Sequence, residues 1–90
     1  MFDWDEANIS HIARHDITPE EAEHVLLNDP LELMVQIHGD EERVLHVGAT
    51  KALRYLVVLT TWREERLRVV TAYEAPRALR LKYIQGQRRQ

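Results

Sequence analysis

Residues 18–37 read TPEEAEHVLLNDPLELMVQI, and the hydrophobic period changes in the middle of this stretch. Thr18 and Glu21 flank a proline at the first helical position, so a capping hydroxyl and a matching carboxylate predict a helix start. Apolar residues then recur at helical spacing, and the helix is expected to end before Pro30, because a residue that precedes proline resists the α conformation. From 31 to 37 apolar residues alternate with mostly polar ones, which predicts a half-buried strand.

Before this stretch the sequence predicts one more helix, over residues 6–15. Asp5 is a suitable N-cap for it, and Ile9 and Ile12 lie three residues apart on one face. The first four residues alternate between apolar and acidic side chains, as in a short strand.

After this stretch the sequence predicts three further strands and a last helix. The strands are expected over residues 43–47, 55–61 and 67–73, and the middle one is almost wholly apolar, as in a strand covered on both faces. Pro76 suits a first helical turn, and Gly86 is expected to end that helix. The order indicates an α+β fold with two N-terminal helices, a four-stranded antiparallel sheet and a C-terminal helix, in which the helices cover one face of the sheet. The whole chain is expected to form one domain.

The composition of the chain excludes several kinds of site and of protein. The chain has no cysteine, which excludes disulfides and thiolate zinc sites and suits a reducing cytosol. No apolar run approaches the roughly 20 residues that span a bilayer. The first ten residues have neither the basic start nor the apolar core of a signal peptide. We therefore expect a cytoplasmic protein that does not contact a membrane.

Histidines are the first candidates for chemistry. His11 and His15 lie four residues apart and could hold a metal from one helix face, but no HExxH pattern is present and the other histidines fall on separate elements. No metal site and no cofactor are therefore expected. His15 suits the end of its helix, where an imidazole meets the last carbonyls, and it is also a candidate for proton transfer.

Charge is distributed unevenly along the chain. Residues 1–42 contain 12 acids and one base, and residues 43–90 contain 3 acids and 11 bases, so the two sums of −11 and +8 give the net charge of −3. A basic half can bind a polyanion even when the total is acidic. Alternatively, the two halves neutralise each other across the fold.

Arginine and tyrosine are interleaved in the basic half, and residues 68–77, RVVTAYEAPR, combine them at a strand end. This combination suits single-stranded RNA, because arginine clamps phosphate while tyrosine stacks on a base or passes a proton. The 2′-hydroxyl of RNA can itself attack the phosphate, so cleavage needs only groups that move protons and stabilise the oxyanion. The alternative is that arginines at strand edges serve solubility and edge protection.

One further pattern covers nearly the whole chain and is carried by Phe2, Trp4, Asp5, Glu6, Asn8, Arg14, His15, Ile17, Thr18, Glu20, Glu21, Ala22, Asp29, Pro30, Glu42, Arg43, Gly48, Leu56, Val57, Val58, Arg66, Arg68, Val69, Val70, Thr71, Ala72 and Tyr83. In their order and spacing these residues resemble the BrnT-type ribonuclease toxins of bacterial type II toxin–antitoxin systems, which have a RelE-like fold. The family usually has an arginine where this chain has Tyr73, and often another base where it has Glu74.

The resemblance implies a toxin that cleaves single-stranded RNA without a metal ion. It also implies a BrnA-like antitoxin protein that covers the toxin and represses the shared promoter. The candidate catalytic residues are Arg43, Arg68, Tyr73 and His15. The candidate RNA-binding residues are Arg63, Arg66, Arg77, Arg80 and Tyr83. The alternative is a catalytically weak RNA- or protein-binding module of the same fold. A homodimer is also considered, because so small a domain is marginally stable alone.

Overall fold

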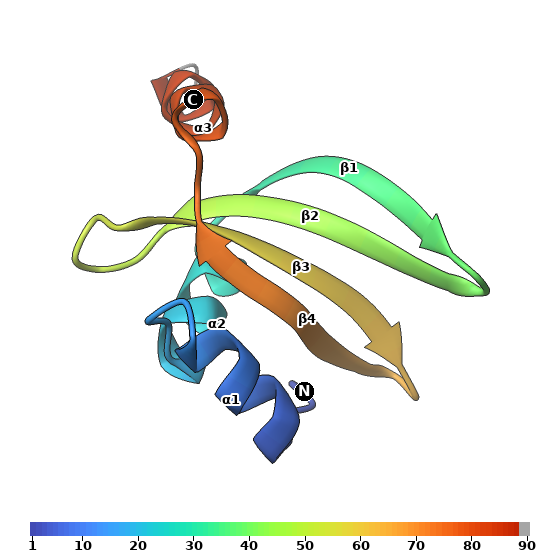
Figure 1. The fold of residues 1–90 in the computed structure, drawn as a ribbon. Coiled ribbons are helices and arrows are strands. Elements are labelled where there is room, and N and C mark those ends of the chain that lie inside the picture. Colours follow the sequence, from blue (N-terminus) through green and yellow to red (C-terminus); the bar gives the residue numbers. More distant parts are fainter. Residues whose placement is uncertain (89–90) are drawn as a thin grey trace.

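The computed structural model describes residues 1–88, which form three helices and four strands (Figure 1). In chain order these are α1 (Glu6–Ala13), α2 (Pro19–Leu27), β1 (Leu31–His38), β2 (Glu41–Ala49), β3 (Tyr55–Arg63), β4 (Arg66–Glu74) and α3 (Arg77–Arg88). The strands form one antiparallel sheet in the order β1-β2-β3-β4. The predicted α+β class, the order of elements and the interior place of β3 are confirmed.

Both N-terminal helices begin at the predicted caps. The Thr18 hydroxyl accepts a hydrogen bond from the Glu21 amide at 3.1 Å, and the Glu21 carboxylate accepts one from the Thr18 amide at 3.0 Å. In α1 the Asp5 carboxylate accepts from the Asn8 amide at 2.9 Å. Each cap satisfies amides that have no partner within the helix, and so fixes where the helix starts.

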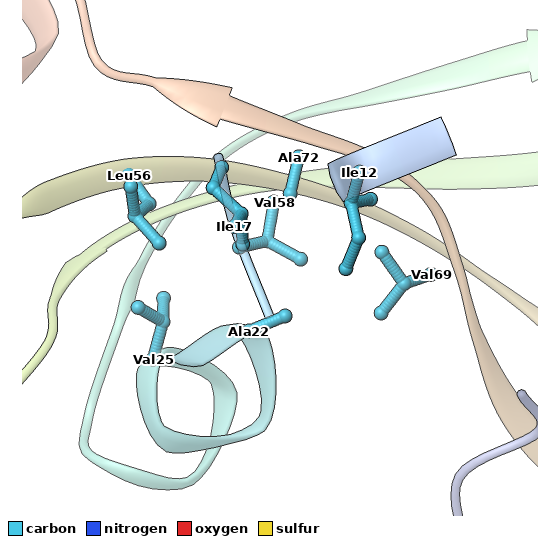
Figure 2. Close-up of a cluster of buried hydrophobic side chains, with 8 residues drawn as sticks. All are labelled: Ile12, Ile17, Ala22, Val25, Leu56, Val58, Val69 and Ala72. Atoms are coloured by element: carbon cyan, nitrogen blue, oxygen red, sulfur yellow. The ribbon is translucent and has the colours of Figure 1, made fainter. Parts of the chain in front are cut away.

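The sheet packs against helices on both faces. Leu56 and Val58 of β3 point to the face covered by α1 and α2, here called the α1–α2 face, where Ile12 and Val25 meet them (Figure 2). Val57, between them, points to the opposite side, here called the α3 face. The full buried cluster on the α1–α2 face is Ile12, Ile17, Ala22, Val25, Leu56, Val58, Val69 and Ala72.

The prediction that all helices cover one face is wrong for α3. Leu79 and Tyr83 of α3 pack against the buried Val47 and Val57 on the α3 face, and Figure 1 shows α3 on the side of the sheet opposite α1 and α2. The physical reason is the apolar character of β3 on both faces, which requires cover on both sides.

Two glycines lie inside elements that were predicted to end at or before them. Gly48 lies inside β2, although the predicted strand ends at residue 47. A Cβ at this position would stand 2.8 Å from Cγ1 of Val25, so the glycine lets α2 approach the sheet closely. Gly86 lies inside α3, which continues to Arg88, so this glycine does not end the helix.

The chain start lies beside β4. Phe2 forms a parallel bridge with Leu67, the Asp3 amide donates to the Leu67 carbonyl at 2.9 Å, and the Leu67 amide donates to the Met1 carbonyl at 3.0 Å. The first residues therefore cover the β4 edge of the sheet.

Candidate nucleic-acid interface

Four arginines of the predicted site lie on the α3 face. Arg43 of β2 is directly opposite Thr61 of β3, Thr61 is opposite Arg68 of β4, and Arg63 is opposite Arg66. Residues directly opposite one another in an antiparallel sheet point to the same side. Figure 1 shows that α3 lies over the other end of this face, so the end with the arginines is left open.

A β-bulge in β4 decides which residues join them. Leu59 pairs with Thr71 and Thr60 pairs with Val69, so Val70 is the extra residue on β4. If Val70 were instead paired regularly with Leu59, Thr71 and Tyr73 would point to the opposite face, because the side-chain period of a strand is two. The residues of β4 that point to the α3 face are Arg66, Arg68, Thr71 and Tyr73.

Two predicted catalytic residues, His15 and Tyr73, lie side by side. Their ring centroids are 6.4 Å apart, and the rings of His11 and His15 are 5.9 Å apart. His11 Nε2 lies 2.9 Å from the Thr71 hydroxyl, which joins α1 to β4. We call His11, His15, Thr71 and Tyr73 the His–Tyr cluster. Sequence reasoning considered His11 only as a metal ligand and did not single out Thr71, because nothing local signals that these two meet.

Arg54 fixes the turn that carries His15. Its guanidinium donates to the His15 carbonyl at 3.1 Å and to the Asp16 carbonyl at 2.5 Å, and it lies 3.5 Å from the Glu21 carboxylate and 3.8 Å from that of Glu74. Five donors in a planar fork suit such a multiple contact. Sequence reasoning missed this role, since Arg54 stands in an ordinary turn sequence far along the chain from its partners.

Arg68 is engaged within the protein. Its guanidinium lies 2.8 Å from the Asp5 carboxylate and 3.4 Å from that of Asp3, and its side chain is 14% exposed. The hydrogen bond to Asp5 raises the pKa of Arg68. The Asn8 amide, followed by Arg68, lowers the pKa of Asp5. Arg68 therefore ties the chain start to β4.

Arg43 is engaged in a similar way. Its Nε lies 2.7 Å from the Glu41 carboxylate, and this contact is the main cause that lowers the pKa of Glu41. Arg63 lies 3.8 Å from the same carboxylate and is about half exposed. One acid therefore serves two arginines of the α3 face, and the contact to Arg63 is the weaker.

The predicted RNA-binding residues fall into two groups. Arg66, Arg77 and Arg80 make no ion pair within residues 1–88, and Arg66 and Arg77 are exposed. Tyr83 instead packs edge-on against Tyr55, with ring centroids 6.1 Å apart, and burial raises its pKa. Tyr83 therefore fastens α3 to the sheet.

Two further observations concern metals and membranes. Among residues 1–88, no group of three or more histidine, aspartate or glutamate side chains is placed to hold a metal ion. None of the helices in this range has both the length and the apolar character that crossing a bilayer requires.

Comparison with known proteins gives one match. A family model described as the ribonuclease toxin BrnT of a type II toxin–antitoxin system matches residues 4–78. The match includes the whole sheet, the His–Tyr cluster and Arg77, while Arg80 and Tyr83 lie beyond it. A search of curated proteins found no match.

Proposed function

Because the chain belongs to the BrnT family of type II ribonuclease toxins, we propose that it cleaves single-stranded RNA without a metal ion. Membership of this family implies an RNA target and an antitoxin partner. The observation that carries the proposal is the position of His15 against Tyr73, which points to the same face of β4 as Arg66 and Arg68. A candidate proton-transfer group and candidate phosphate-binding groups thus lie on one face of the same strand.

The reaction assigned to this site is transesterification. The 2′-hydroxyl oxygen bonds to the adjacent phosphorus and loses its proton, while the bond from phosphorus to the 5′-oxygen breaks and that oxygen gains a proton. The products are a 2′,3′-cyclic phosphate and a 5′-hydroxyl. In the proposed reaction His15 accepts the proton of the 2′-hydroxyl, because an imidazole can act as a base near neutral pH. The Tyr73 hydroxyl donates a proton to the departing 5′-oxygen, and proton exchange with the solvent returns both groups to their starting states.

The arginines supply the positive field for the phosphates. Arg66 and Arg77 are the direct contacts in this proposal, since they have no ion-pair partner within residues 1–88. Arg63 and Arg80 extend the surface. Arg43 and Arg68 reach a phosphate only by exchanging a carboxylate for it.

The identity of the antitoxin, the compartment in which the toxin and antitoxin act, and the oligomeric state of the free toxin are also proposed. We take the antitoxin to be BrnA-like and the pair to act in the bacterial cytoplasm. A homodimer of the free toxin is a further proposal, which sedimentation analysis of the purified chain tests.

The decisive experiment is single-turnover cleavage of a labelled single-stranded RNA. His15→Gln and Tyr73→Phe should each lower the rate by roughly 10²–10⁴-fold. The matched control is His38→Gln on the exposed β1, which should cleave at the wild-type rate. A chelator should leave the rate unchanged. Cleavage that is insensitive to both variants would place the chemistry elsewhere, and cleavage abolished by chelator would reject the metal-independent mechanism.

A catalytically weak RNA-binding module remains the second candidate. It is favoured by Tyr73 and Glu74, which stand where the family usually has bases, and by the exposure of the Glu74 carboxylate near the cluster. Under this reading the wild type cleaves no faster than Tyr73→Phe. Tyr73→Arg should then increase the rate.

A further inference from the structure

The α1–α2 face is hollowed beyond the end of α2. The groove has a volume of about 450 Å³ and lies between the end of α2 and strands β1 to β4. Its apolar lining comes from Leu26, Val44, Trp62 and Leu67. Figure 1 shows the strands continuing past the two N-terminal helices, so this part of the face has no helix over it.

Large apolar side chains beside the groove are exposed. Val35 and Ile37 of β1 are 57% and 70% exposed, and Trp62 is 61% exposed. Val35 and Trp62 lie next to residues that line the groove, because the strand register places Val35 opposite Val44 and Trp62 opposite Leu67. An apolar surface of this kind, next to a groove, is typical of a protein-interaction site.

The floor of the groove contains a polar group without a partner. His46 is buried, with 8% of its surface exposed, and its Nε2 lies 2.9 Å from the Thr60 hydroxyl. Its Nδ1 has no hydrogen-bond partner among the side chains of residues 1–87. Such atoms are rare in native proteins, so this nitrogen is free to accept a hydrogen bond from, or donate one to, a group that enters the groove.

The rim of the groove is acidic. Asp29 and Glu32 line it, and Glu42 lies directly opposite Ile37 on the same face. Among residues 1–87, whose side chains the structure describes, none of these three carboxylates takes part in an ion pair, and no lysine or arginine lines the groove. A partner that fits must therefore present apolar side chains together with positive charge.

We propose that this groove docks a basic amphipathic segment of the antitoxin, an inference that rests on the proposed function. A second copy of this chain, placed face to face, would bring two acidic rims together, so it fits less well. The segment binds on the side of the sheet opposite the arginines and the His–Tyr cluster. The antitoxin thus holds the toxin by a surface that the RNA does not use.

The test uses the antitoxin encoded next to this chain and isothermal titration calorimetry with the full-length toxin. Trp62→Ala should weaken antitoxin binding by about 30-fold or more, as for a central aromatic anchor. Glu32→Lys should also weaken it, by repelling the basic segment. The matched control pair is Ile37→Thr and Met34→Thr: both positions are exposed on β1, but Met34 points to the α3 face, so only Ile37→Thr should weaken binding.

RNA cleavage separates this proposal from the proposed function. Trp62→Ala should fold, as judged by circular dichroism, and should cleave RNA at the wild-type rate while escaping the antitoxin. Antitoxin binding that is unchanged in Trp62→Ala, Glu32→Lys and Ile37→Thr would overturn the docking site and leave the proposed function intact. Absence of any antitoxin, or dimerisation of the toxin that depends on Trp62, would overturn it as well. Failure of the wild type to cleave RNA would count against the proposed function alone.

Discussion

At the scale of single residues, Gly48 sets how closely α2 can approach the sheet. Gly48→Ala should lower the free energy of unfolding by about 1–3 kcal/mol, because its Cβ would stand 2.8 Å from Cγ1 of Val25. The matched control is Gly86→Ala in α3, where no atom lies within 4 Å of an added Cβ. That change should stabilise by roughly 0.5–1 kcal/mol, since alanine is the better helix former. Urea unfolding of both variants measures the difference, and equal effects would contradict the close approach.

The hydrogen bond from the Asn8 amide and the ion pair with Arg68 both lower the pKa of Asp5, and together they predict that stability falls at low pH. The folded-state pKa of Asp5 is lowered below its ordinary value of 3.8, so its stabilising contribution is present above that value and is lost as the pH falls through the folded pKa. In Asp5→Asn, which keeps a capping side chain, the unfolding midpoint should depend less on pH below about 4. Unfolding curves between pH 7 and pH 2 test this, with Asp40→Asn in the β1–β2 turn as the control. Parallel pH profiles for wild type and Asp5→Asn would argue against a stabilising role of the Asp5 carboxylate in the cap and in the ion pair.

Sequence reasoning could identify the arginines but not their partners. The pattern placed Arg43 and Arg68 on strands, as observed, yet Arg68 meets carboxylates more than sixty positions away in the chain. Long-range pairs of this kind leave no local periodicity. The same applies to His15, whose contact with Tyr73 depends on how the α1–α2 turn sits on the sheet, and to Arg54, which holds that turn.

At the scale of elements, the clearest local signals were the most reliable. The capping box of α2 was predictable because its interactions span only three residues. Thr18→Ala should destabilise the protein by about 1 kcal/mol, since the Glu21 amide loses its acceptor. Urea unfolding measures this, with the exposed Ser10→Ala inside α1 as a control that should change little. An unchanged midpoint for Thr18→Ala would count against the cap.

The bulge in β4 could not be predicted, because the run Val69-Val70-Thr71 reads as continuous strand. It nevertheless decides the site, since it keeps Thr71 and Tyr73 on the same face as Arg68. Deleting Val70 should restore a regular strand, because Val69 and Thr71 would then be consecutive residues opposite Thr60 and Leu59, and Thr71 and Tyr73 should stay on the α3 face. We therefore expect the deletion variant, like Val70→Thr, to keep a cooperative thermal transition. Loss of that transition in the deletion variant alone would show that the fold needs the bulge itself.

At the scale of the whole molecule, the charges of the two halves of the chain neutralise each other only in part. Arg43, Arg54 and Arg68 of the basic half pair with acids of the acidic half, so these charges neutralise each other across the fold. The acids Asp29 and Glu32 of the first half line the groove on the α1–α2 face, while Arg66 and Arg77 of the second half stay unpaired within residues 1–88. The unpaired acids and the unpaired bases named here, which come from opposite halves of the chain, thus lie on opposite sides of the sheet.

This separation predicts how RNA binding depends on salt. If Arg63, Arg66, Arg77 and Arg80 each neutralise one phosphate, the logarithm of the binding constant should fall with the logarithm of salt concentration with a slope of about −3, at roughly −0.7 per contact for a single strand. Arg66→Gln should make this slope shallower by about 0.7 and weaken binding to all RNA sequences alike. Lys51→Gln removes the same charge from the side of the molecule where Lys51 lies beside Glu20 and Glu21 of α2, and it should leave the slope unchanged. Fluorescence anisotropy of a labelled single-stranded RNA between 50 mM and 300 mM salt is the measurement. Equal slopes for the wild type and both variants would mean that RNA does not bind on the α3 face.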